Sequence, residues 1–196
     1  QIRIGASDTI CRYFLVPFIE RFHKAFPGAH IKVTNATSIQ SVELLNSGQV
    51  DFIVVNSPNA YLGSVTKIKR IKIFQDVFLA NQSFKELKGR QLSFQELLEY
   101  PILMLDKKST TSEFLHNLFQ QHHLDLVPEA ELSSNDLLIG LGIAFLPDYC
   151  IPPDDPDLFV VKTKEELPSR ELLAVHSQHL PLSKAASAFL NYFEEV

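Results

Sequence analysis

The chain has 196 residues, of which 45% are hydrophobic and 21% are charged, a composition typical of a globular protein with one or two domains. Its formal net charge of −5 argues against direct contact with nucleic acid, because neutralising phosphates requires clustered Lys and Arg. No apolar run approaches the ~20 residues that span a bilayer, so no membrane contact is expected. Cys11 and Cys150 are too few for a disulfide framework and fit two free thiols in a cytosolic protein. No metal-ligand spacing is evident, so no cofactor is expected.

The first elements predicted are a strand and a long helix. Residues 1–6 alternate as a strand, and Ser7-Asp8-Thr9 follows as a turn of helix-capping residues. Apolar side chains then recur at helical spacing and predict one helix that ends at Pro27-Gly28. Pro17 lies inside this pattern and either kinks the helix or begins a second segment.

A strand–helix–strand unit follows over residues 30–58. Residues 30–34 are predicted as a strand, and Thr37 and Ser38 are placed to cap a short helix. Gly48 closes that helix, since glycine adopts the left-handed C-terminal conformation without a Cβ clash. Residues 52–55 are continuously apolar, as in a strand covered on both faces. In open α/β sheets, ligands bind at the carboxyl end of the strands, which is where the Thr37-Ser38 turn is expected.

The middle of the chain repeats this arrangement. Residues 74–81 are predicted as a strand that leaves a first lobe for a second, and residues 93–99 as a short helix. A strand over 102–105 precedes the polar turn that contains Ser109, Thr110 and Thr111, and residues 113–122 form the next amphipathic helix.

A break in the pattern follows the predicted strand at 130–132. Ser133 and Ser134 begin a turn that caps another helix, but Ile139 is joined directly to Gly140, ahead of a buried strand at 142–147. A helix of one turn cannot run into a buried strand without a connection of at least about two residues. Either the helix is truncated or residues are missing between Ile139 and Gly140, and we favour missing residues.

The C-terminal part is predicted to hold two strands and a helix. The strands cover residues 158–161 and 171–176, and the second returns to the first lobe. The helix covers residues 183–195 and is capped by Ser183.

Three segments, in this order and spacing, resemble the effector-binding domain of LysR-type transcriptional regulators. They are Gly48-Gln-Val-Asp-Phe-Ile-Val54, Gly140-Leu-Gly-Ile-Ala-Phe-Leu-Pro147 and the segment from Leu182 to Leu190. The resemblance implies an α/β, two-lobed, periplasmic-binding-protein-like (type 2) fold, with two Rossmann-like lobes joined by two crossing strands. Lobe I is then expected at 1–77 plus 173–196 and lobe II at 78–172, without the helix-turn-helix and linker helix of a full regulator.

Four turns that each follow a strand and begin a helix are the candidate ligand site. Helix N-termini offer unpaired amides and a partial positive charge, which suit a small anion. Taken singly, a Ser or Thr at a helix start is more often only a cap, and the Asp8 carboxylate repels an anion unless it turns outward. The resemblance implies that these turns line an effector cleft between the lobes. The candidate residues are Ser7, Asp8, Thr9, Thr37, Ser38, Ser109, Thr110, Thr111, Ser133 and Ser134.

The function implied is a cytoplasmic sensor that binds a small metabolite and transmits the event allosterically to a DNA-binding domain outside this chain. A homodimer or higher homo-oligomer is expected, with helix surfaces near 12–24 and 113–122 in contact. No catalytic motif is found, so no enzymatic activity is expected. The alternative is a secreted or lipoprotein solute-binding protein of a transporter, which has the same two-lobed fold.

Overall fold

The computed structural model describes residues 1–64, 66–105, 109–132 and 142–196. The chain forms two compact units, residues 1–73 with 170–196 and residues 74–169. The sequence predicted the boundaries between the two lobes after residues 77 and 172. The predicted break after Ile139 and the turn at Ser133 and Ser134 lie outside the described residues. Within the described part of the chain, no helix is both long and apolar enough to cross a membrane.

Unit 1 is built on one five-stranded sheet with the order β2-β1-β3-β11-β4. β1 pairs in parallel with both β2 and β3, and β11 pairs antiparallel with β3. The carboxyl ends of β1, β2 and β3 therefore share one edge of the sheet. The strands are β1 (Ile2–Ala6), β2 (Ile31–Asn35), β3 (Phe52–Asn56), β4 (Thr66–Phe74) and β11 (Arg170–Ser177).

The helix that follows β1 changes register at Pro17. It comprises α1 (Asp8–Ile10), a π-helical segment η1 (Cys11–Leu15) and α2 (Val16–Ala25). Across the π segment the Val16 amide donates to the Cys11 carbonyl. Pro17 then falls in the first turn of α2, where its missing amide hydrogen breaks no helical bond. The backbone is helical on both sides of this segment, with αR conformation at Cys11, Leu15 and Val16, so Pro17 is accommodated by the π segment within one continuous helix.

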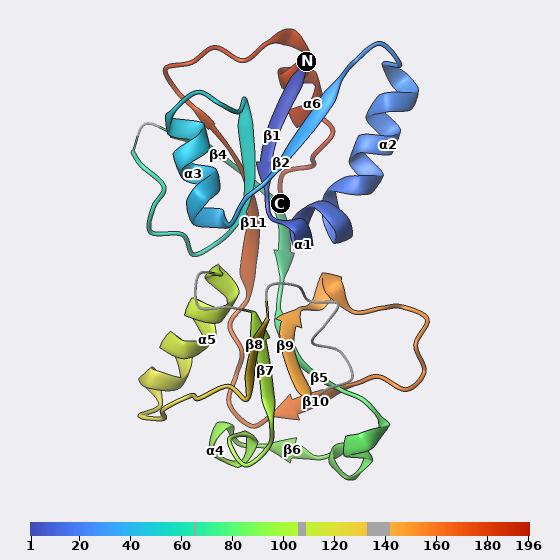
Figure 1. Cartoon of the computed structure of the whole chain (residues 1–196), viewed down its shortest axis with the longest axis vertical. Coiled ribbons are helices and arrows are strands. Elements are labelled where there is room, and N and C mark those ends of the chain that lie inside the picture. The colour runs from blue at the N-terminus through green and yellow to red at the C-terminus, as the bar shows by residue number, and fades with distance from the viewer. Residues whose placement is uncertain (65, 106–108, 133–141) are drawn as a thin grey trace. The chain divides into compact units, whose positions relative to one another are not determined.

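Helices cover both faces of the unit 1 sheet, with α3 (Ser38–Asn46) on one face and α2 and α6 (Lys184–Leu190) on the other (Figure 1). Ile53 and Val55 of β3 pack in a cluster with Val42 and Leu45 of α3. On the other face, the Phe52 ring lies 5.8 Å from Phe189 of α6, between centroids. Neighbouring residues of β3 thus bury side chains on opposite faces, which explains its continuous apolar run.

The Gly48-to-Val54 motif holds the end of α3 to β1. Gly48 has a φ of 71°, and its carbonyl accepts a hydrogen bond of 3.1 Å from the Arg3 guanidinium. One Asp51 carboxylate oxygen accepts from the Arg3 backbone amide at 2.7 Å and the other from its guanidinium at 2.9 Å. The glycine and the aspartate of this motif are therefore explained by local structure.

Unit 2 contains a six-stranded sheet with the order β6-β10-β5-β9-β7-β8. β7 pairs in parallel with β8 and β9, while β5 pairs antiparallel with β9 and β10. The strands are β5 (Asp76–Ala80), β6 (Gln91–Leu92), β7 (Ile102–Leu105), β8 (Ala130–Leu132), β9 (Ile143–Pro147) and β10 (Phe159–Thr163).

Two helices of unit 2 pack together on its core. α4 (Phe94–Leu97) and α5 (Thr110–Gln121) meet through the Phe94 and Phe119 rings, which stack with centroids 4.6 Å apart. Both rings belong to one buried cluster with Phe78 of β5 and Phe145 of β9. Short 3-10 segments lie at η2 (Gln82–Leu87) and η4 (Asp148–Cys150).

Most predicted elements differ by a residue or more from their bounds in the structure, and three of them are instructive. The strand predicted over 74–81 is β5, which starts at Asp76. α5 begins three residues before the predicted 113, because Ser109 supplies its N-cap. The last helix ends at Leu190 rather than near residue 195, because the chain turns there and buries Phe193, which is 2% exposed.

Candidate functional site

The turns after β1 and β2 lie next to each other at the carboxyl edge of unit 1. Ala6 and Asn35 are partners in the parallel register, and the Ala36 amide donates to the Ala6 carbonyl at 3.0 Å. This hydrogen bond carries the pairing one residue beyond the strands. The Ser7 and Thr37 turns, 30 residues apart in sequence, therefore start from neighbouring positions.

Thr37 serves as the cap of α3. Its Oγ1 accepts from the Gln40 amide at 3.1 Å, and its own amide donates to Gln40 Oε1 at 3.1 Å. This capping box engages the first and the fourth amides of the helix start. The amides of Ser38 and Ile39 lie between these two, and within the described residues neither the capping box nor the helix supplies an acceptor for them. Ser38 is 6% exposed, so its side chain is largely withdrawn from solvent.

The turn after β1 combines a cap with an ion pair. Ser7 Oγ accepts from the Ile10 amide at 3.2 Å. The Asp8 carboxylate lies 3.4 Å from the Arg12 guanidinium, and about half of each side chain is exposed. Arg12 therefore offsets the charge with which Asp8 repels an anion, and Thr9 follows in the same turn of α1.

Cys11 lies next to this turn in the π segment. Partial burial, followed by the Asp8 carboxylate, raises the pKa of the Cys11 thiol above its ordinary value of 9.0. The thiol is accordingly protonated at neutral pH and adds no negative charge to the turn.

The sequence analysis missed a polar residue at the end of β3. Asn56 closes this strand, is 7% exposed and pairs with Leu172 of β11 in the sheet register. Its position at the same carboxyl edge as Ser7 and Thr37 makes it a further candidate. An asparagine that ends an otherwise apolar strand is the signal that could have identified it.

In unit 2, the candidate residues of the Ser109 turn form the start of α5. Ser109 Oγ accepts from the Ser112 amide at 3.0 Å, so Ser109 is the N-cap. Thr110 and Thr111 occupy the first two helical positions and are 7% and 3% exposed. Neither threonine is the cap, which makes a ligand role for Thr110 separable from helix capping.

Two buried serines follow these caps. Ser41 in α3 is fully buried and Ser112 in α5 is 1% exposed, and within the described structure neither hydroxyl has a hydrogen-bond partner. Gly5 lies against Ser41, since a Cβ built on Gly5 would come 3.5 Å from Ser41 Oγ. A buried hydroxyl without a partner costs stability.

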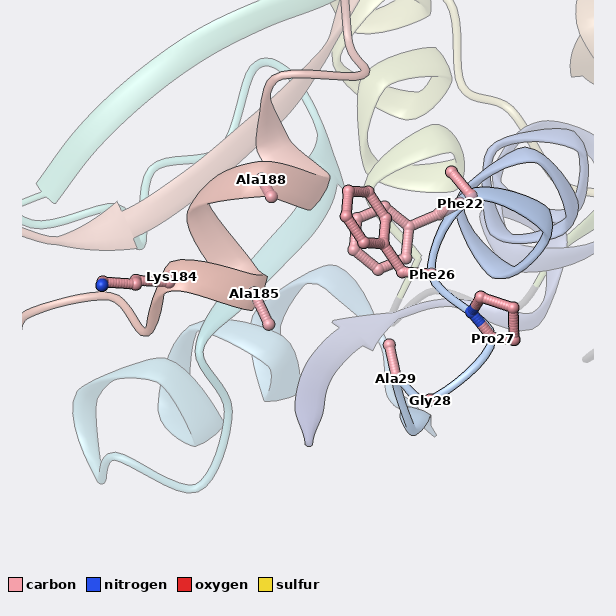
Figure 2. A pocket seen from close by; sticks show the side chains of 9 residues that line it. Phe22, Phe26, Pro27, Gly28, Ala29, Lys184, Ala185 and Ala188 are labelled. Carbon is pink, nitrogen blue, oxygen red and sulfur yellow. The ribbon is translucent and has the colours of Figure 1, made fainter.

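A separate apolar groove of about 610 Å³ lies on unit 1 (Figure 2). It contains none of the predicted turn residues. Among residues 1–64, 66–105, 109–132 and 142–196, no three His, Cys, Asp or Glu side chains gather so as to hold a metal ion. The groove is lined by Phe22, Ala25, Phe26, Pro27, Gly28, Ala29, Lys184, Ala185 and Ala188.

Comparison with known protein families and sequences gives a consistent match. Residues 1–196 match the family described as the LysR substrate binding domain. The chain is 23% identical over 194 residues to the transcriptional activator CmpR of Synechocystis, covering 95% of this chain and 63% of CmpR. It is 24% identical over 202 residues to the regulator YfeR of Shigella flexneri, covering 96% of this chain and 62% of YfeR. The chain thus spans less than two thirds of these relatives.

Solved structures show the same fold. The Synechocystis CcmR regulatory domain, in complex with 2-PG, aligns with a TM-score of 0.86 at 20% identity and covers 97% of this chain and 94% of that one. The BenM effector-binding domain with its effector benzoate aligns with a TM-score of 0.76 at 18% identity and covers 97% and 88%. The fold is the α/β, type 2 periplasmic-binding-protein-like fold of effector-binding domains.

Proposed function

The chain belongs to the LysR substrate binding domain family, and from this premise we propose that it senses a small anionic effector. Its relatives are transcriptional regulators and not enzymes, which favours this function over that of a transporter's solute-binding protein. The proposed ligand-binding positions are the turns before α1 and α3 in unit 1 and, in unit 2 taken by itself, the turn before α5. Binding shifts the regulator between states that differ in DNA binding.

One observation carries the proposal: in the start of α3, the capping box and the helix together leave the amides of Ser38 and Ile39 available to a ligand. Two adjacent amides at a helix N-terminus suit a carboxylate or phosphate group, because the helix dipole adds partial positive charge. The start of α5 places Thr110 and Thr111 at the equivalent first two helical positions, after the Ser109 cap. The BenM domain binds benzoate, a carboxylate, which supports an anionic effector.

We also propose that the regulator works in the cytoplasm as a homodimer or higher homo-oligomer and contacts DNA through a separate domain. The exposed surfaces of α2 and α5 are the proposed contacts between copies. Val16 on α2 is 39% exposed, and the same helix exposes the basic Arg21 and Lys24 with one acidic residue, Glu20, whereas α5 exposes the acidic Glu113. Opposite charges on two helices suit a two-fold pair in which α2 of one copy meets α5 of the other.

A thermal-shift screen of the chain with small carboxylates and phosphate esters, benzoate and 2-PG included, tests the proposal. A bound anion at 100 times its Kd should stabilise the fold by roughly 2.7 kcal/mol. No stabilisation by any member of a broad anion panel would count against an anionic effector.

Thr110→Val then locates the site. Thr110 is not a cap, so melting should be unchanged, whereas the loss of a hydrogen bond to a charged group should weaken binding by about 1.5–3 kcal/mol, or roughly ten- to a hundredfold. Thr163→Val is the matched control, since the Thr163 hydroxyl donates to the Glu165 carbonyl at 2.7 Å. The control should lower the melting temperature and leave affinity unchanged. Unchanged affinity in Thr110→Val would remove Thr110 from the site.

A further inference from the structure

The groove on unit 1 combines one exposed aromatic ring, that of Phe26, with a lining of mostly small residues. Phe22 and Phe26 lie with ring centroids 4.8 Å apart, yet Phe22 is 1% exposed and Phe26 is 48% exposed. Figure 2 shows these rings facing Ala185 and Ala188 of α6 across the groove, while the Lys184 amine points away from it. The interior of the groove therefore suits apolar side chains.

The N-terminus of the chain lies beside this groove. The Ile2 amide donates to the His30 carbonyl at 2.7 Å, and the residue before His30 is Ala29, which lines the groove. Any residues ahead of Gln1 therefore leave β1 next to the groove and have only a short distance to cross.

We propose that the groove binds apolar side chains of the segment that precedes Gln1 in the full-length regulator, and so holds the sensor against its DNA-binding part. This inference rests on the proposed function, because it requires a DNA-binding segment in the same protein. The relatives CmpR and YfeR, both named as helix-turn-helix regulators, extend well beyond the part that this chain matches, which is 63% and 62% of their length.

A tethered segment fits the groove better than an independent partner. A separate protein needs about 800 Å² of its own surface to form a stable interface, more than a groove of nine lining residues, four of them alanines, provides. A segment that starts beside the groove is present at millimolar effective concentration, roughly. The entropic cost of loop closure grows only slowly with loop length, so a small apolar contact is sufficient.

Thiol labelling tests the proposal on the isolated chain and on the full-length protein. Ala188→Cys places a thiol in the groove, and Ser187→Cys places one on the exposed side of the same helix as the matched control. Both carry Cys11→Ser, and the remaining Cys150 is buried. In the full-length protein the thiol at 188 should react about tenfold more slowly than in the isolated chain, which corresponds to about 1.4 kcal/mol of docking. The thiol at 187 should react at the same rate in both.

Phe26→Ser in the full-length protein should restore fast labelling at 188, because it removes the aromatic wall. Equal rates at 188 in both proteins overturn the proposal. If labelling at 188 in the isolated chain slows as its concentration rises, the groove binds a second copy of the chain. If labelling at 187 slows as much as at 188 in the full-length protein, α6 is covered as a whole. Either result also overturns the proposal. Effector binding is measured on the isolated chain, so a failure here leaves the proposed function untouched.

Discussion

Replacing Asp51 by alanine should destabilise unit 1 through β1. The change removes the acceptor of the Arg3 backbone amide, a charge-assisted bond of 2.7 Å, and such a bond contributes about 1.5–3 kcal/mol. The ion pair with the Arg3 guanidinium adds little, since the side chain of Arg3 is 40% exposed and exposed pairs contribute about 0–1 kcal/mol. The free energy of unfolding should therefore fall by about 2–3 kcal/mol.

Thermal and urea unfolding of three variants measure this effect. For a chain of this length, about 2–3 kcal/mol corresponds to a fall in Tm of roughly 4–12 °C. Asp51→Asn keeps one side-chain oxygen as a neutral acceptor and should lose only about 1 kcal/mol. Arg3→Ala keeps the bond between its own backbone amide and Asp51, so it should cost less than Asp51→Ala.

The order of the variants decides the matter. If Arg3→Ala is as destabilising as Asp51→Ala, the side-chain ion pair and the Gly48 contact dominate, and the backbone bond is not the main contribution. If Asp51→Ala leaves both Tm and the urea midpoint unchanged, the structural explanation of the motif is wrong.

Three further predictions concern stability. Gly48→Ala should cost about 1–2 kcal/mol by urea unfolding because of its φ of 71°, whereas Gly28→Ala, with nothing within 4 Å of the added Cβ, should stay within about 0.5 kcal/mol; equal effects would contradict the argument. Ser41→Ala should raise the free energy of unfolding by about 1 kcal/mol, because it removes a buried hydroxyl without a partner among the described residues; a lower midpoint would show that the hydroxyl is satisfied. Hydrogen bonding from the Ser93 backbone lowers the pKa of Glu96 in the folded state. The contribution of Glu96 to the free energy of unfolding is therefore complete above its unfolded-state pKa and disappears as pH falls through the lower folded-state pKa. Glu96→Gln should flatten that part of a titration of stability against acid pH, and an unchanged curve would refute this.

Regular periodicity made much of the fold predictable. β8 occupies the predicted residues 130–132, and β3 extends the predicted strand by one residue to Asn56. Thr37 caps α3 as its residue type suggested. These features depend on local chemistry, in which hydroxyls accept helix amides and apolar runs mark strands covered on both faces.

Features that depend on distant partners were less accessible. The π segment before Pro17 is one of two ways to accommodate the missing amide, and nothing in the local sequence chooses between them. The last helix ends early because Phe193 packs on Phe18, with ring centroids 4.8 Å apart. Helix propensity does not depend on such a distant contact and so could not predict this end. At the site, capping and ligand binding use the same residue types, so the pattern could not separate Ser109, which is the cap, from Thr110, which is not.

The position of β11 between β3 and β4 affects how the protein folds during synthesis. The ribosome releases β1 to β4 first, but β3 and β4 are joined only through β11, which lies in the last part of the chain. Unit 2 is complete in sequence by Ser169, before Arg170–Val196 emerges. Domains commonly fold in the order of their synthesis, N-terminal first, but here the inserted unit can finish while the unit that contains the N-terminus still exposes an open sheet edge. That edge is a template for pairing with other chains, so the interval before β11 emerges is when the nascent protein is most exposed to aggregation.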